Sequence, residues 1–168
     1  MSAVITDLSV AEAISHIPDP EVPVISIADL GILRSVEVDE GAHRVTVTIT
    51  PTYSGCPAME AITSRIVFEA DSRGYAAEVL TRLSPAWTTD WMSDEGKESL
   101  RRFGIAPPGP ATHGHSGPVA VSLHKRVVTC PNCGSDDTTE IAHFGSTACK
   151  ALRRCESCRE PFDEFKAI

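Results

Sequence analysis

Residues 44–83 read RVTVTITPTYSGCPAMEAITSRIVFEADSRGYAAEVLTRL, and their pattern is the most informative about the fold of the first half of the chain. Residues 44–50 alternate valine and isoleucine with threonine, which predicts a strand with one buried face. Residues 57–73 carry an apolar stripe at helical spacing, between a proline suited to a helix start and a glycine suited to a helix end. A third strand is predicted over 77–84, so the stretch forms a strand–helix–strand unit.

The segments on either side extend this unit. Ser9 followed by Glu12 forms a capping box, which predicts a short helix from residue 9 to about 16. Residues 36–49 alternate around a Glu40-Gly41 turn, as a β-hairpin does. A last helix is predicted over 93–104. The order of elements indicates an α+β fold, with helices packed on a sheet of three or more strands.

A proline- and glycine-rich stretch divides the chain. Residues 107–118, PPGPATHGHSGP, cannot build a core and are typical of a semi-rigid linker. We therefore expect an α+β domain over residues 1–106, a linker over 107–123 and a separate small β domain over 124–168. The last part is too short to fold on an apolar core alone, so a metal ion or cross-links must stabilise it.

Charge and composition exclude several classes of protein. The 168 residues carry a net charge of −8, which argues against nucleic acid or an anionic membrane as partner. No apolar run is long enough to span a bilayer. The first residues lack the basic, apolar pattern of a signal peptide, so we expect a cytoplasmic protein in a reducing compartment.

Four cysteines near the end of the chain have the spacing of a metal site. Cys130 and Cys133 form one C-x2-C pair, Cys155 and Cys158 form another, and 21 residues separate the pairs. Two such knuckles, brought together by a hairpin, complete a tetrahedral site of four sulfurs that suits Zn²⁺. Such a closed site is expected to stabilise the fold rather than to perform chemistry. A rubredoxin-like iron centre or an iron–sulfur cluster is the alternative.

Cys149 falls between the two pairs and has three interpretations. It is a small core residue, an additional ligand to a cluster, or a reactive thiol.

Cys56 precedes Pro57 at the predicted start of the second helix. A proline disfavours helical dihedrals in the residue before it, so we expect Cys56 at the N-cap, where the helix dipole lowers a thiol pKa. A buried structural cysteine is the alternative. Asp19 and Glu21 lie on a loop with two prolines, and if that loop lies beside Cys56 the three side chains could hold iron transiently.

Two stretches, DPEVPVISIADLGILRSVEV and TPTYSGCPAMEAI, resemble the iron–sulfur cluster assembly family that includes bacterial SufT. The whole chain resembles the PaaD family, accessory subunits of the phenylacetyl-CoA epoxidase of aerobic phenylacetate degradation. SPAWTTDWMSDEG, CPNCG, FGSTACKAL and CESCREPFDEFK carry that likeness.

The resemblance implies a role in maturation rather than catalysis. It implies that Cys56 is the functional cysteine, with Asp19 and Glu21 in an acidic motif and the four paired cysteines as zinc ligands. Cys149 falls within the FGSTACKA motif. The implied partners are the reductase and oxygenase subunits, which would receive iron or iron–sulfur centres; a homo-oligomer is also open. Two rivals remain: an electron-transfer subunit with iron in the tail, and a purely structural subunit.

Overall fold

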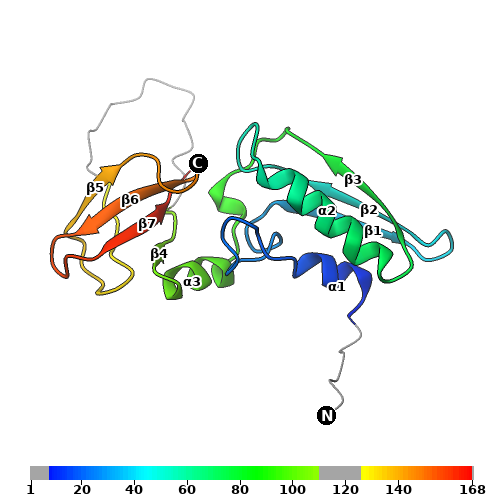
Figure 1. Cartoon of the computed structure of the whole chain (residues 1–168), viewed down its shortest axis with the longest axis horizontal. Helices are drawn as coiled ribbons and strands as arrows, with labels where there is room; N and C mark the ends of the chain where they lie inside the picture. Colours follow the sequence, from blue (N-terminus) through cyan, green and yellow to red (C-terminus); the bar gives the residue numbers. More distant parts are fainter. Residues whose placement is uncertain (1–7, 110–125, 168) are drawn as a thin grey trace, which may run out of the picture. The chain divides into compact units, whose positions relative to one another are not determined.

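A computed structural model describes residues 8–109 and 126–167 (Figure 1). The chain divides into two compact units, Met1–Trp87 and Thr88–Ile168. The first described stretch therefore contributes residues to both units.

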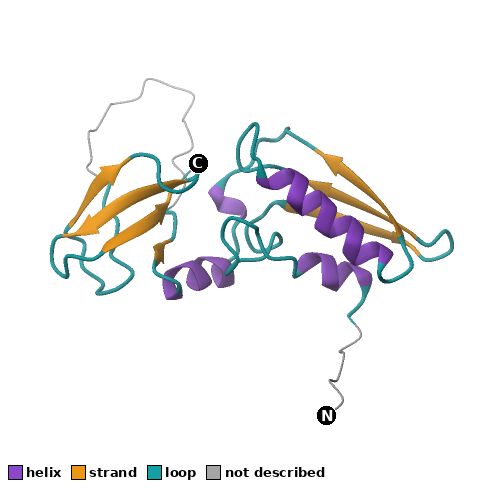
Figure 2. Ribbon diagram, in the orientation of Figure 1, coloured by secondary structure: helices purple, strands orange, loops and turns teal. Residues whose placement is uncertain are grey.

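The first unit is a three-stranded sheet covered by two helices (Figure 2). The capping box of Ser9 and Glu12 forms as expected. The sheet has the order β1-β2-β3, with β1 antiparallel and β3 parallel to β2. The elements are α1 (Val10–Ser15), β1 (Leu33–Asp39), β2 (Arg44–Ile49), α2 (Ala58–Asp71) and β3 (Ala76–Thr81). The predicted α+β class and the three-stranded sheet with packed helices are confirmed.

The core of this unit lies between β2 and α2. Val45, Val47 and Ile49 are fully buried on one face of the sheet. Ile62 and Ile66 are buried on the facing stripe of α2, as their spacing of four residues predicts. Because side chains alternate along a strand, the threonines of β2 point to the opposite face.

The second unit holds a four-stranded sheet with the order β4-β7-β6-β5. β6 is antiparallel to β5 and β7, whereas β4 is parallel to β7. The elements are the 3-10 helix η1 (Thr89–Trp91), α3 (Asp94–Arg102), β4 (Ile105–Ala106), β5 (Thr138–Ala142), β6 (Lys150–Cys155) and β7 (Pro161–Phe165).

The boundary between the units differs from the one expected at residue 106. Ile105 and Ala106 pair with Asp163 and Glu164 of β7, so β4 and the helix before it belong to the second unit. The predicted linker over 107–123 begins directly after β4. Its residues 110–123 lie outside the described part of the chain. A two-residue strand that pairs more than fifty residues away has no local sequence signal.

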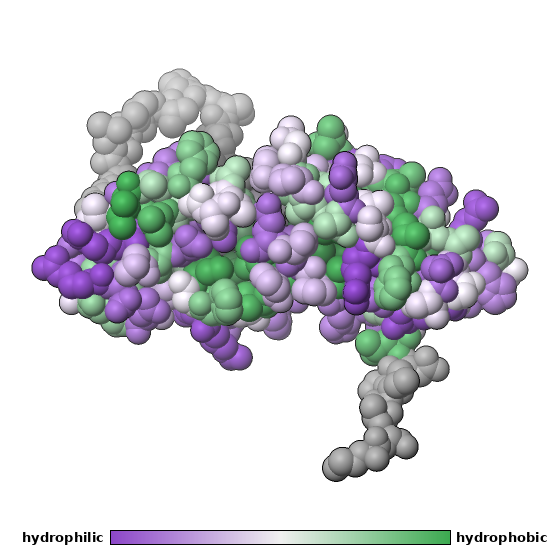
Figure 3. Space-filling model, in the orientation of Figure 1, coloured by the Kyte–Doolittle hydropathy of each residue, from purple (hydrophilic) through white to green (hydrophobic). Residues whose placement is uncertain are grey.

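Hydrophilic and apolar residues are interspersed over the face of the molecule that Figure 3 draws. None of the helices in the described parts of the chain is long and apolar enough to span a membrane.

Candidate functional site

The four paired cysteines meet in the second unit. Their sulfur atoms all lie within 4.8 Å of one another. The Sγ atoms of Cys130 and Cys158 are 3.8 Å apart, and those of Cys133 and Cys155 are 3.5 Å apart. A tetrahedral zinc ion with Zn–S bonds of about 2.3 Å would separate its sulfurs by about 3.8 Å. The donor set and its dimensions therefore fit Zn²⁺.

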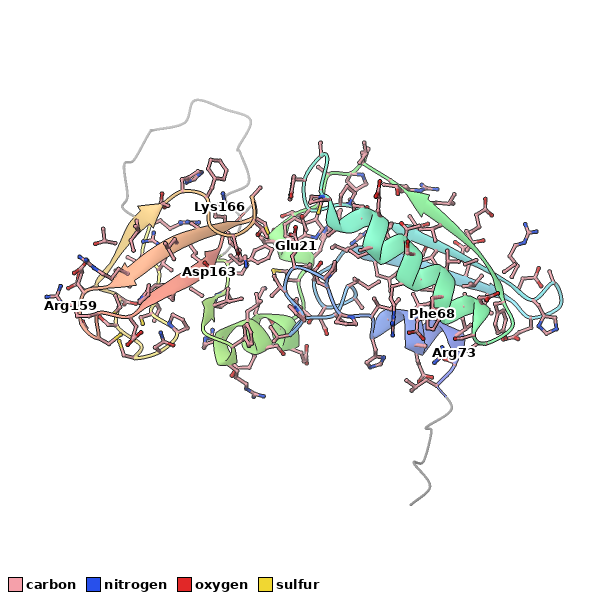
Figure 4. All side chains as sticks on the ribbon, viewed as in Figure 1. Glu21, Phe68, Arg73, Arg159, Asp163 and Lys166 are labelled. Atoms are coloured by element: carbon pink, nitrogen blue, oxygen red, sulfur yellow. The ribbon has the colours of Figure 1, made fainter. Side chains whose placement is uncertain are left out.

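Both knuckles use the same backbone geometry. The N–H of Gly134 donates to the carbonyl of Cys130 at 2.9 Å, and the N–H of Arg159 donates to the carbonyl of Cys155 at 3.0 Å. Gly134 and Arg159, each directly after the second cysteine of its pair, have positive φ of 76° and 68°. Figure 4 labels Arg159 at the second knuckle. Glycine adopts a positive φ readily, whereas arginine rarely does, so the sequence gives no signal for this turn at Arg159.

The protein around the sulfurs favours the thiolate at one position. Cys155 is fully buried, and its Sγ accepts a hydrogen bond from the backbone N–H of Cys158 at 3.5 Å. This N–H is the largest cause of a pKa of about 6 for the Cys155 thiol, and hydrogen bonds from the Cys133 and Cys158 thiols lower that pKa further. Cys130 and Cys155 also belong to a small core with Val128 and Phe162. The metal site and the apolar core of the ribbon are therefore continuous.

Cys56 lies one residue earlier than expected relative to α2. The helix begins at Ala58 with Pro57 as its N-cap, so the cysteine precedes the cap. Its side chain is 9% exposed. The backbone N–H of Ala58 and the Tyr53 hydroxyl still hydrogen-bond the sulfur. Tyr53 was not singled out from the sequence; its place three residues before Cys56, on the same turn, is the available signal.

The pKa of the Cys56 thiol is raised, which corrects the expectation of a lowered pKa. Burial is the largest cause, because it disfavours the thiolate. The negative charges of Glu21 and Asp19 raise the pKa further, and the two hydrogen bonds to the sulfur oppose this only in part. The acidic loop is thus close enough to Cys56 to act on it through charge. Figure 4 labels Glu21 on this loop.

Asp19 has a defined place in that loop. Its carboxylate is 4% exposed and accepts hydrogen bonds from the backbone N–H groups of Glu21 at 2.9 Å and Val22 at 2.8 Å. Its own N–H donates to the carbonyl of Ile25 at 2.9 Å. Asp19 therefore holds the loop in shape while it contributes charge.

The three side chains do not form a ready ligand set. Metal ligation needs three or more histidine, cysteine or acidic side chains with their ligand atoms close together. Within residues 8–109 and 126–167, only the four-cysteine cluster meets this condition. Cys56, Asp19 and Glu21 are brought together electrostatically, not as three ligands of one ion.

Cys149 lies outside the four-sulfur cluster. It is 4% exposed just before β6, and its Sγ is 3.0 Å from the Thr147 hydroxyl. Its carbonyl accepts the backbone N–H of Lys166 at 2.9 Å. This is the environment of a small buried core residue.

Comparison with known proteins identifies the family. Residues 115–166 match a family described as the PaaD zinc beta ribbon domain. A relative from Escherichia coli (strain K12), named provisionally as a 1,2-phenylacetyl-CoA epoxidase subunit, is 49% identical over 92% of this chain and 89% of its own length. The chain belongs to the PaaD family.

This PaaD-family chain also matches a second family and shorter proteins. Residues 9–70 match a family described as iron–sulfur cluster assembly protein. An Fe-S protein maturation auxiliary factor from Porphyromonas gingivalis (strain ATCC BAA-308 / W83) is 32% identical over 56% of the chain and 90% of its own length. The crystal structure of a domain of unknown function from Bacillus anthracis, 28% identical, covers 54% of this chain and 87% of that one, with a TM-score of 0.48. Cys56, Asp19 and Glu21 all fall within the matched residues 9–70.

Proposed function

We propose that this PaaD-family protein is a non-catalytic accessory factor that handles iron or an iron–sulfur cluster for a phenylacetyl-CoA epoxidase. Its first unit would receive and release the cargo at Cys56, and its zinc ribbon would serve as a rigid docking module. The observation that carries the proposal is the environment of Cys56: a largely buried thiol in the field of two carboxylates. The match of residues 9–70 to an iron–sulfur cluster assembly family and of residues 115–166 to a zinc ribbon family supports this division of roles.

The raised pKa of the Cys56 thiol makes the binding of a cationic cargo depend on pH. A thiol whose pKa is raised by burial and by neighbouring negative charge is protonated at neutral pH. An approaching iron cation reverses the sign of the local field and allows the proton to leave, so that binding releases a proton and strengthens as the pH rises. Protonation of the sulfur favours release. One thiolate with weak carboxylate support suits a transfer site better than a permanent one.

The partners in this proposal are proteins of the epoxidase system. The reductase and oxygenase subunits are the clients to be loaded, and the factor would act in the cytoplasm. Neither nucleic acid nor a membrane is required.

The test is the metal content of the clients. Cys56→Ser is expected to leave the zinc ribbon loaded while a co-expressed reductase or oxygenase loses most of its iron. Cys149→Ser is the matched control, because it also removes one buried thiol but lies outside both sites. A fully loaded, active client beside the Cys56→Ser protein would overturn the proposal.

A further inference from the structure

A polar hollow opens on the face of the three-stranded sheet that is turned away from the core of the first unit. Its volume is about 300 Å³. The side chains around it are mostly hydroxyls and guanidinium groups: Arg34, Ser35, Glu37, Thr48, Thr50, Arg82, Ser84 and Pro85. Neither Cys56 nor the acidic loop takes part in it.

A β-bulge places the first arginine at this hollow. Leu33 pairs with Ile49 and Ser35 pairs with Thr48, so Arg34 is an extra residue in β1. A bulge of this kind redirects a side chain that regular alternation would send to the other face. Arg82 enters from the end of β3, where its N–H donates to the carbonyl of Ile49 at 2.9 Å.

Two threonine hydroxyls form the floor. Thr50 is 3% exposed and Thr48 is 8% exposed, and neither hydroxyl has a hydrogen-bond partner among the described residues. In the same part of the chain, no fully enclosed side-chain oxygen or nitrogen lacks a partner. The small exposed part of each threonine must therefore include its hydroxyl, which opens into the hollow.

The positive charge of the hollow is unusual in this unit. Residues 1–87 contain five arginines, no lysine and twelve acidic residues. Two of the five arginines line this one hollow, together with one carboxylate, that of Glu37. Arg82 makes no ion pair with a described residue.

We infer that this hollow is a binding site for the oxyanion group, phosphate or carboxylate, of a small molecule. Guanidinium groups match such oxygens in geometry and charge, and hydroxyls donate to the remaining lone pairs. The volume is at the lower end for small-molecule sites, which suits one anionic group with a short attachment. Bound anion would satisfy the two threonine hydroxyls that the described residues leave unpaired.

The test is a titration of the zinc-loaded full chain with inorganic phosphate and, separately, with acetate at constant ionic strength. Backbone amide NMR shifts at Thr48, Thr50 and Arg82 are expected to saturate, and the anion that binds more tightly identifies the preferred group. Arg82→Gln is expected to weaken binding about tenfold and Thr50→Val about fivefold.

Arg44→Gln provides the matched control, since Arg44 is an exposed arginine of β2 that does not line the hollow. It should leave binding unchanged. Shifts that stay linear up to high anion concentration, or equal weakening by Arg44→Gln, would show a general charge effect and overturn the inference.

Discussion

Burial and nearby negative charge both raise the pKa of the Cys56 thiol. The position before a proline and a helix indicated a lowered pKa, but the cap is Pro57, and the sulfur is largely removed from solvent. A residue's burial depends on parts of the chain that sequence spacing does not report. The sequence left open whether the acidic loop lies beside Cys56; in the structure the charges of Glu21 and Asp19 raise the pKa of the thiol.

Replacing Glu21 by glutamine tests this electrostatic contact. Removal of the charge should lower the Cys56 pKa and speed alkylation of the thiol by iodoacetamide near pH 8, measured as a pH–rate profile. Glu60→Gln is the control, because Glu60 is an exposed acid of α2 that does not contribute to the raised pKa. Identical profiles for both variants would remove Glu21 from the site.

The same raised pKa makes stability depend on pH. The folded state holds the thiol proton more firmly than the unfolded chain, so this contribution is present below the ordinary thiol pKa of about 8.5 and is lost as the pH rises through the folded value. The free energy of unfolding should therefore fall more steeply above about pH 8.5 in the parent chain than in Cys56→Ser. Denaturant titrations at several pH values measure the difference, and parallel curves would argue against it.

At the scale of elements, most of the first unit could be predicted. The capping box of α1, the alternation in β2 and the stripe of α2 are local patterns, and each forms as expected. The four zinc-ligand cysteines were likewise evident from spacing, and their sulfurs converge. The hollow with Arg34 was not foreseen, because a bulge is a property of strand pairing rather than of composition.

The first zinc knuckle allows a matched glycine test. An added Cβ would meet open space at both Gly134 and Gly109, but only Gly134 has a positive φ, of 76°. Gly134→Ala should therefore lower the free energy of unfolding by about 1 kcal/mol and weaken zinc binding about fivefold. Gly109→Ala should have little effect on either quantity. Competition with a chromophoric chelator measures the zinc affinity of both variants. Equal losses of affinity would show that backbone strain at Gly134 is not the cause of the weaker binding.

At the scale of the whole molecule, residues 88–106 belong to the second unit and not to the first. They were expected in the first domain because the proline- and glycine-rich stretch over 107–118 follows them in the sequence. The pairing of β4 with β7, and the burial of Ala106 in the ribbon core, assign them to the second unit.

This assignment predicts different behaviour for two shortened chains. A chain beginning at Thr88 should fold with zinc, whereas one beginning at Pro107 lacks β4 and a core residue and should bind zinc more weakly and melt at a lower temperature. Calorimetry and chelator competition compare the two. Equal stability would mean that the ribbon folds without β4.

Anaerobic iron binding by the purified, zinc-loaded chain measures the role of Cys56 most directly. We expect iron to bind weakly, with release of a proton and with affinity that increases with pH. Binding should be retained in Cys149→Ser and lost in Cys56→Ser, while both variants keep their zinc. If Cys56→Ser binds iron as well as the parent chain does, Cys56 is not the cargo site.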